Sequence, residues 1–222
     1  MLKAQGGKCP GCGAALKSGL FSPNYRECEY TFELLCKSCH TGQARVLPAR
    51  ALWAWDLNPA PVCDKVASFL DAIADKPLLC ITAVNAELYN LVPALHHVRL
   101  LRVQLCLMRD YILGCKRRVS LLGRLEPRSY YLDNCEMWSL SDLTRVATGT
   151  LSSYLTDHVE TIGRHITKEC RECKSRGHTC LFCLADELLY PFDILNVVQC
   201  AGCQTYSHRS CFIPEACPTC QR

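Results

Sequence analysis

The chain has 222 residues, of which 49% are hydrophobic and 21% charged, and its formal net charge is +4. This length suits one sizeable domain or two small ones, and the composition favours a globular core over a disordered chain. The small positive charge permits an acidic partner or a negatively charged membrane surface, and nucleic-acid binding is not expected.

Cysteine is the unusual component, with 19 residues. A secreted disulfide-bonded protein starts with an apolar signal segment, whereas the first residues here, MLKAQGGKCPGC, reach a Cys-x2-Cys pair directly. Two cysteines three positions apart on a turn suit one tetrahedral zinc ion far better than two disulfides to distant partners. We therefore expect an intracellular protein whose cysteines bind metal.

The first group of ligands consists of two pairs, Cys9-x2-Cys12 and Cys36-x2-Cys39, with 23 residues between the pairs. This is the pattern of a zinc ribbon, in which two knuckle turns direct four thiolates at one ion. Four protein ligands leave no position for water, so the pattern predicts a structural zinc. Cys28 and His40 are left over.

Residues 46–61, VLPARALWAWDLNPAP, follow this first group. Their prolines and large apolar side chains predict an extended segment that packs Trp53 and Trp55 between the zinc cluster and the helices.

The middle of the chain is predicted to be helical, because apolar residues recur there at steps of three and four. We expect helices over 62–74, over 85–91 with Asn85 as N-cap, over 94–118, from Ser139 or Ser141 to near Gly149, and over 151–166. The third has an apolar stripe made by Leu95, Val98, Leu101, Leu105, Met108 and Ile112. Four charged residues in 94–113 exclude a membrane-spanning helix there.

A basic stripe accompanies that apolar stripe, and it consists of Arg99, Arg102, Arg109 and Lys116. Such a stripe is either a solvated face or the border of a partner-binding surface. The isolated cysteines of the middle have no neighbour at ligand spacing, so burial as small apolar side chains is the expectation for them. They are Cys63, Cys80, Cys106, Cys115 and Cys135.

The C-terminal part holds ligand pairs in close succession. Eight ligands in four pairs would complete two closed sites of a cross-braced module. The expected sites are Cys180, Cys183, His208 and Cys211, and Cys200, Cys203, Cys217 and Cys220. Sequential pairing, with sites over 180–203 and 208–220, is the alternative that spacing leaves open.

One further pair, Cys170-x2-Cys173, needs two partners. His165 is the natural third ligand, because the last helix delivers it close to the pair. The fourth could be Cys28, which would tie the two ends of the chain together; His158 and His178 are the alternatives. The ligand groups together predict three to four structural zinc ions.

Several segments give the chain a resemblance to a known family. They are CEYTFELLCKSCH (28–40), VLPARALWAWDLNP (46–59), LRVQLCLMRDYILGC (101–115), YLDNCEMWSLSDL (131–143) and LLYPFDILNVVQCAGCQTYSHRSC (188–211). In their order and spacing the chain resembles the Rubicon-homology domain family, and the resemblance covers nearly everything from Cys9 to Cys220.

That resemblance implies a function. Members of the family act in autophagy and endolysosomal traffic, and several bind the GTP form of a late-endosomal Rab GTPase through this domain. The chain is thus expected to be a Rab-binding effector module, peripheral on late endosomes or lysosomes, with possible direct membrane contact. Known relatives usually carry further domains ahead of this one, so we expect either a fragment or a minimal member.

An enzyme is not expected, because the sequence has no Ser/His/Asp order, no phosphate-binding glycine loop and no HExxH motif. The alternative function is a RING- or PHD-like component of a ubiquitin ligase, since cross-braced zinc modules include those classes. The expected fold is α+β and zinc-stabilised. A single domain over 1–222 would contain N-terminal zinc knuckles (9–45), a helical region (46–166) and a C-terminal zinc module (165–222).

Overall fold

The computed structural model describes residues 1–19 and 22–221 of the chain. They form two compact units, the first from residues 1–92 and 137–147 and the second from residues 93–136 and the described residues from 148 onward. Both units combine helices with two-stranded antiparallel sheets, so the predicted α+β class is confirmed. None of the described helices has the length and apolarity needed to cross a bilayer.

The first unit contains most of the short strands of the chain. Its elements are β1 (Tyr25–Cys28), β2 (Glu33–Cys36), β3 (Ala44–Arg45), α1 (Pro48–Ala54), β4 (Ala60–Pro61), α2 (Asp64–Ile73), β5 (Leu79–Cys80), α3 (Ile81–Asn85), α4 (Leu88–Leu91), β6 (Met137–Trp138) and α7 (Leu140–Ala147). The sheets are β1–β2, β3–β4 and β5–β6.

The hairpin of β1 and β2 forms one wall of the first core. Tyr25 pairs with Cys36 and Cys28 pairs with Glu33. The inward side chains of the hairpin pack with the buried residues of the predicted helix α2, namely Val66, Ala67 and Leu70. The helix predicted over 62–74 is thus confirmed as Asp64–Ile73.

Within the segment 46–61 that was predicted to be extended, Pro48–Ala54 instead form a helix, α1, whereas Ala60–Pro61 form the strand β4. Pro48 lies in the first turn of α1, where a missing N–H costs nothing and the fixed φ favours the helix. Trp55 closes the helix in the left-handed conformation and its N–H donates to the carbonyl of Ala51. The prediction that both tryptophans are packed inside is wrong for Trp53, whose side chain is 67% exposed.

Asn85 ends a helix and does not begin one. Helix α3 finishes at this residue, and α4 starts only at Leu88. The side-chain amide of Asn85 donates to the carbonyl of Leu52 at 3.2 Å, so it connects α3 to α1 and does not serve as the predicted N-cap.

The second unit is mainly helical. Its elements are α5 (Pro93–Leu113), α6 (Arg118–Gly123), the 3-10 turn η1 (Ser129–Tyr131), α8 (Thr150–Arg164), the π-helical turn η2 (His165–Glu169), α9 (Arg171–Lys174), β7 (Val197–Gln199), β8 (Tyr206–His208) and the 3-10 turn η3 (Pro214–Ala216). Strands β7 and β8 pair with each other.

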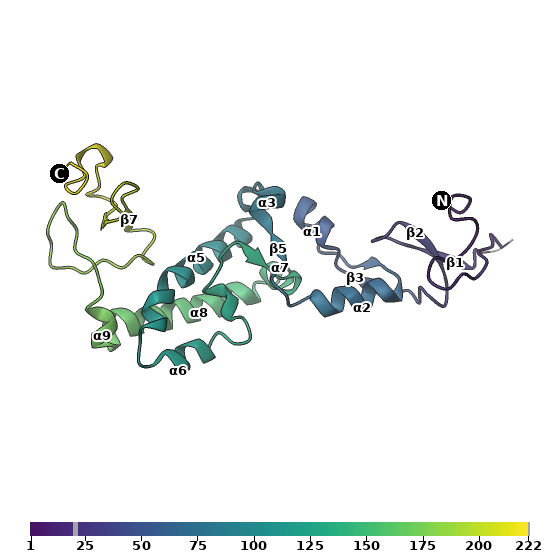
Figure 1. The fold of residues 1–222 in the computed structure, drawn as a ribbon, viewed down its shortest axis with the longest axis horizontal. Coiled ribbons are helices and arrows are strands. Elements are labelled where there is room, and N and C mark those ends of the chain that lie inside the picture. The colour runs from purple at the N-terminus through teal and green to yellow at the C-terminus, as the bar shows by residue number, and fades with distance from the viewer. Residues whose placement is uncertain (20–21, 222) are drawn as a thin grey trace. The chain divides into compact units, whose positions relative to one another are not determined.

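Helices α5 and α8 lie side by side and build the second core (Figure 1). The whole predicted apolar stripe of α5 is buried, as are Leu151, Leu155, Val159 and Ile162 of α8. The helical spacing of these residues therefore indicates packing against a neighbouring helix, and the stripe is not available to an external partner.

Candidate metal centres

Four groups of cysteine and histidine side chains converge in the described part of the chain. In each group the four potential ligand atoms lie within 4.8 Å of one another. We name them the N-terminal tetrad (Cys9, Cys12, Cys36, Cys39), the helix-end tetrad (Cys115, His165, Cys170, Cys173), the His208 tetrad (Cys180, Cys183, His208, Cys211) and the last tetrad (Cys200, Cys203, Cys217, Cys220).

The N-terminal tetrad is positioned by the end of β2 and the turn after Cys9. The Sγ atoms of Cys12 and Cys36 are 3.5 Å apart, and the N–H of Cys36 donates to Sγ of Cys9 at 3.4 Å. A Cβ atom on Gly11 would lie 3.0 Å from Sγ of Cys39, so a larger residue in this knuckle turn would press against a ligand sulfur. This group is the one that the spacing of the two pairs predicts.

The thiols of the N-terminal tetrad cannot all ionise without a cation. Burial opposes ionisation of Cys9, but the N–H groups of Cys36, Gly11 and Cys12 outweigh it and lower the pKa of Cys9 to about 6. Interaction with Cys12 and then with Cys36 raises the pKa of Cys39 to about 12. A divalent cation would remove this conflict, because it binds thiolates and displaces their protons.

The helix-end tetrad lies where α5 and α8 both finish. Cys115 follows α5 and His165 directly follows α8. Cys170 directly precedes the short helix α9, and Cys173 lies within it. Sγ of Cys115 is 3.3 Å from Nε2 of His165 and 4.0 Å from Sγ of Cys170. The carboxylate of Glu169 is 4.0 Å from Nδ1 of His165, close to the position from which acidic groups orient metal-bound histidines.

Cys115 corrects two predictions. It is not an isolated apolar cysteine, and Cys115, not the predicted Cys28, is the fourth member of the group with His165, Cys170 and Cys173. Cys28 is buried in the first unit, where its Sγ accepts from the N–H of Cys63 at 3.3 Å. No local spacing could identify Cys115, because 50 positions separate it from His165.

The other candidate histidines, His158, His178 and His40, have contacts of other kinds. The ring nitrogens of His158 lie within hydrogen-bonding distance of the carbonyls of Tyr154 and Arg124. The His178 ring lies against Tyr206 with centroids 4.5 Å apart. Nε2 of buried His40 is 3.0 Å from the carbonyl of Glu27. None of these three belongs to a tetrad among the described residues.

The His208 tetrad and the last tetrad interleave along the chain. Cys183 Sγ is 3.4 Å from Nδ1 of His208, whereas Cys200 Sγ is 3.6 Å from Sγ of Cys220. The first and third pairs thus share one group and the second and fourth share the other. This is the cross-braced arrangement, and the alternative of sequential pairing is wrong.

Backbone amides and a hydroxyl favour thiolates in these two tetrads as well. Burial opposes ionisation of Cys180, but the N–H groups of Cys183, His208 and Phe182 lower its pKa to about 6. The hydroxyl and the N–H of Thr205 lower the pKa of Cys203 to about 6. Thr205 Oγ1 lies 2.9 Å from that sulfur.

The donor set and the spacings fit a tetrahedral ion. Zinc–sulfur bonds of about 2.3 Å place two sulfur ligands about 3.8 Å apart. Neighbouring sulfur atoms within the tetrads lie 3.5, 3.6, 3.6 and 4.0 Å apart for the pairs Cys12–Cys36, Cys200–Cys220, Cys203–Cys217 and Cys115–Cys170. All four tetrads could therefore hold zinc, with no protein ligand missing from any of them.

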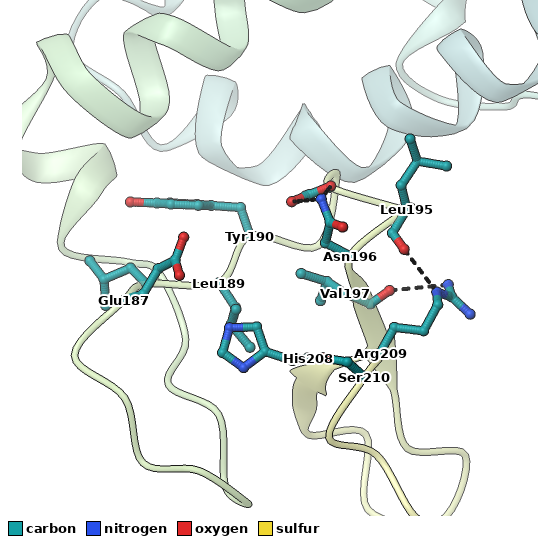
Figure 2. A pocket seen from close by; sticks show the side chains of 11 residues that line it. Glu187, Leu189, Tyr190, Leu195, Asn196, Val197, His208, Arg209 and Ser210 are labelled. Carbon is teal, nitrogen blue, oxygen red and sulfur yellow. Dashed lines mark hydrogen bonds between the residues drawn. The ribbon is translucent and has the colours of Figure 1, made fainter.

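A hollow of about 540 Å³ lies beside the His208 tetrad (Figure 2). Arg209 in its wall donates to the carbonyls of Ile194, Leu195 and Val197. Asn196 donates to the carboxylate of Asp193. These polar side chains stabilise the loop before β7, so the hollow has the features of a structural crevice of the zinc module.

The predicted basic stripe does not form one exposed border. Arg102 is fully buried, its guanidinium donates to the carbonyl of Asn134 at 2.9 Å, and it lies over the ring of Tyr131. It cannot be a residue at the rim of an interface, and that prediction is wrong. Arg99 pairs with Glu136, and Arg109 pairs with Asp133 at 3.1 Å.

The sequence of the chain is similar to sequences of known proteins. The profile of the Rubicon Homology Domain family matches residues 26–222. The chain is 33% identical over 224 aligned residues to pleckstrin homology domain-containing family M member 3 of Xenopus laevis and 32% identical to the Homo sapiens protein of that description. Both alignments cover 100% of this chain, which spans only 30% and 29% of the two relatives.

Proposed function

The chain belongs to the Rubicon homology domain family, and we propose that it is a non-enzymatic module that binds the GTP form of a late-endosomal Rab GTPase. On this proposal four structural zinc ions hold the module together. It would act as an adaptor in endolysosomal traffic and autophagy, as a peripheral protein of late endosomes or lysosomes.

The observation that carries the proposal is the closure of all four tetrads. Each offers four sulfur or nitrogen atoms, and the tetrahedral set of thiolate and imidazole ligands is the one that zinc prefers. When bound, zinc would supply cross-links between chain segments. Four protein ligands fill a tetrahedral shell, so the metal would have no position for substrate. This favours a scaffold that presents a surface.

The partner surface is proposed on the outer side of α5. Arg109 is exposed there, and Arg99 is partly exposed. Their acidic partners Asp133 and Glu136 lie in the loop before β6, so the surface combines both charges. Such mixed charge steers association and selects a partner more than it adds affinity. Lys116 lies beyond the end of α5 and outside this surface.

A pull-down against a panel of Rab GTPases tests the proposal. The zinc-loaded chain should retain a late-endosomal Rab loaded with a non-hydrolysable GTP analogue and not the same protein loaded with GDP. Replacing Arg109 with alanine should slow association several-fold, whereas the matched change Lys65→Ala at another exposed cation should not.

Two outcomes would contradict the proposal. Equal retention of the GTP and GDP forms across the panel would exclude an effector. Discharge of ubiquitin from a charged conjugating enzyme by the zinc-loaded chain would favour the ligase alternative, since a cross-braced fold by itself does not establish either activity.

A further inference from the structure

The surroundings of the helix-end tetrad carry an unusual concentration of positive charge. Eight Lys or Arg residues and only two acidic residues, Glu169 and Glu172, lie within three positions of its ligands. The chain has 25 Lys and Arg and 21 Asp and Glu, so the other residues have 17 basic and 19 acidic side chains. The net positive charge of the protein is therefore concentrated at this one site.

All eight cations are exposed, and seven of them make no side-chain ion pair or side-chain hydrogen bond among the described residues. We call these seven the basic collar: Lys116, Arg117, Arg118, Arg164, Lys168, Arg171 and Lys174. The eighth, Arg176, lies over the ring of Tyr111 and donates to the carbonyl of Asp110. The helix-end tetrad brings these cations together, because each collar residue is at most three positions along the chain from one of the four tetrad residues.

The charge of the tetrad itself does not account for the collar. Three thiolates, a histidine and a divalent ion would carry a net charge of −1, whereas a four-cysteine site would carry −2. Yet the N-terminal tetrad has only Lys8 and Lys37 within three positions, beside Glu33. The less negative site thus has the larger number of cations. Arg164, Lys168, Arg171 and Lys174 lie in last helical turns, whose dipole attracts cations. Lys116 and Arg117 lie beyond the end of α5, and Arg118 begins α6, so the helix dipole does not explain these three.

Exposed apolar side chains accompany the collar. Leu113 is 38% exposed and Val119 is 78% exposed. With Lys116 and Arg118 they line an open hollow of about 570 Å³ that contains no aromatic side chain. In Figure 1, the end of α5 lies near α9, and α6 follows along the chain.

We propose that the basic collar, with Leu113 and Val119 at its edge, docks on the surface of an anionic phospholipid bilayer. Lys and Arg would lie at the level of the charged headgroups, and the two aliphatic side chains would enter the adjoining apolar layer. Sites for single-stranded nucleic acid usually contain aromatic side chains on which the bases stack, and this hollow has none. The contact needs no GTPase, so it would add a second attachment to the membrane on which the partner resides.

Vesicle co-sedimentation tests the inference with the zinc-loaded chain alone. Vesicles of phosphatidylcholine containing phosphatidylserine should bind the protein, and vesicles of phosphatidylcholine alone should not. Because each cation near such a surface contributes about 1 kcal/mol, the triple variant Lys116→Gln, Arg117→Gln, Arg118→Gln should bind about a hundredfold more weakly. Val119→Asp should also weaken binding, and high salt should reduce it.

A matched triple variant keeps the test specific. Lys3→Gln, Lys65→Gln and Lys76→Gln remove the same charge from exposed positions outside the collar, and binding should be preserved. Zinc content and thermal unfolding of both triple variants should equal those of the unchanged chain. Any of four results would overturn the proposal. The two triple variants could lose vesicle binding equally, or the unchanged chain could bind neutral vesicles as well as anionic ones. Soluble glycerophosphoserine could inhibit vesicle binding, or the chain could prefer a DNA oligonucleotide to the vesicles.

Discussion

Cys115 reaches the helix-end tetrad because two helices that are far apart in the sequence end at the same place. Helix α5 finishes at Leu113 and α8 at Arg164, and the ligand atoms of Cys115 and His165 are 3.3 Å apart. The pairing of α5 with α8 is a property of the folded core, so ligand counting along the chain could supply His165, Cys170 and Cys173 but not the fourth residue.

Replacing Cys115 with serine should remove one zinc ion per chain. A hydroxyl does not replace a thiolate as a zinc ligand at neutral pH, and structural zinc sites contribute about 10–16 kcal/mol of apparent binding free energy. Elemental analysis should give one ion fewer than in the unchanged chain. Cys28→Ser provides the control, since Cys28 is buried in the same way but belongs to no tetrad. An unchanged zinc content in Cys115→Ser would show that the helix-end tetrad does not bind metal.

Arg102 and Arg109 should respond very differently to charge reversal, although both are arginines on α5. Arg102 is fully buried beneath Tyr130 and Tyr131, so Arg102→Glu should lower the free energy of unfolding by about 3–5 kcal/mol. Arg109 is exposed, so Arg109→Glu should change the free energy of unfolding by about 0.5 kcal/mol or less. Urea denaturation measures both values. Similar, small effects of the two changes would mean that Arg102 is not part of the core.

At the scale of elements, α7 shows what local sequence can determine. The N–H of Asp142 donates to Oγ of Ser139 at 3.0 Å, and the N–H of Ser139 donates to the Asp142 carboxylate at 3.1 Å. This reciprocal capping box fixes the start of the helix, and Ser139 is one of the two caps that the sequence predicts. The information lies within four consecutive residues, which is why the prediction holds.

Ser139→Ala should lower the free energy of unfolding by about 1 kcal/mol, because one end of the capping box loses its acceptor. The matched change is Ser141→Ala, because Ser141 lies inside the first turn of α7 and its side chain takes no part in the capping box of Ser139 and Asp142. Thermal unfolding followed by circular dichroism compares the two. A larger effect at Ser141 than at Ser139 would contradict the assignment of the cap.

Helix α1 shows where local signals mislead. A proline such as Pro48 breaks a helix when it lies in the interior, but it favours a helix when it occupies the first turn. The local sequence does not show which of these two positions Pro48 occupies. Trp53 is equally ambiguous, because a large aromatic residue is usually buried, yet here it is exposed. The helices α2, α5, α7 and α8 were predictable, since their apolar residues repeat over two turns or more; α1 has only Ala51 and Leu52 buried.

At the scale of the molecule, most of the zinc ligands were predictable because Cys-x2-Cys turns are local. The partition of eight C-terminal ligands into two interleaved groups required three-dimensional information, as did the recruitment of Cys115. The prediction of one domain over 1–222 stays a prediction. The described residues cluster into two units, of which the first contains one tetrad and the second contains three.

This distribution makes the consequences of metal loss specific to each unit. Cys9→Ser opens only the N-terminal tetrad, so the chain should lose one zinc ion and the amide protection of β1 and β2, while α5 and α8 keep theirs. Hydrogen exchange read by mass spectrometry on the zinc-loaded protein resolves these segments. A strong chelator should remove the ions from all tetrads and abolish cooperative unfolding of both units, because binding of metal and folding are coupled at closed sites. Persistence of protected amides around the N-terminal tetrad after complete removal of metal would show that the apolar core of the first unit, with α2 packed on the β1–β2 hairpin, suffices without the ion.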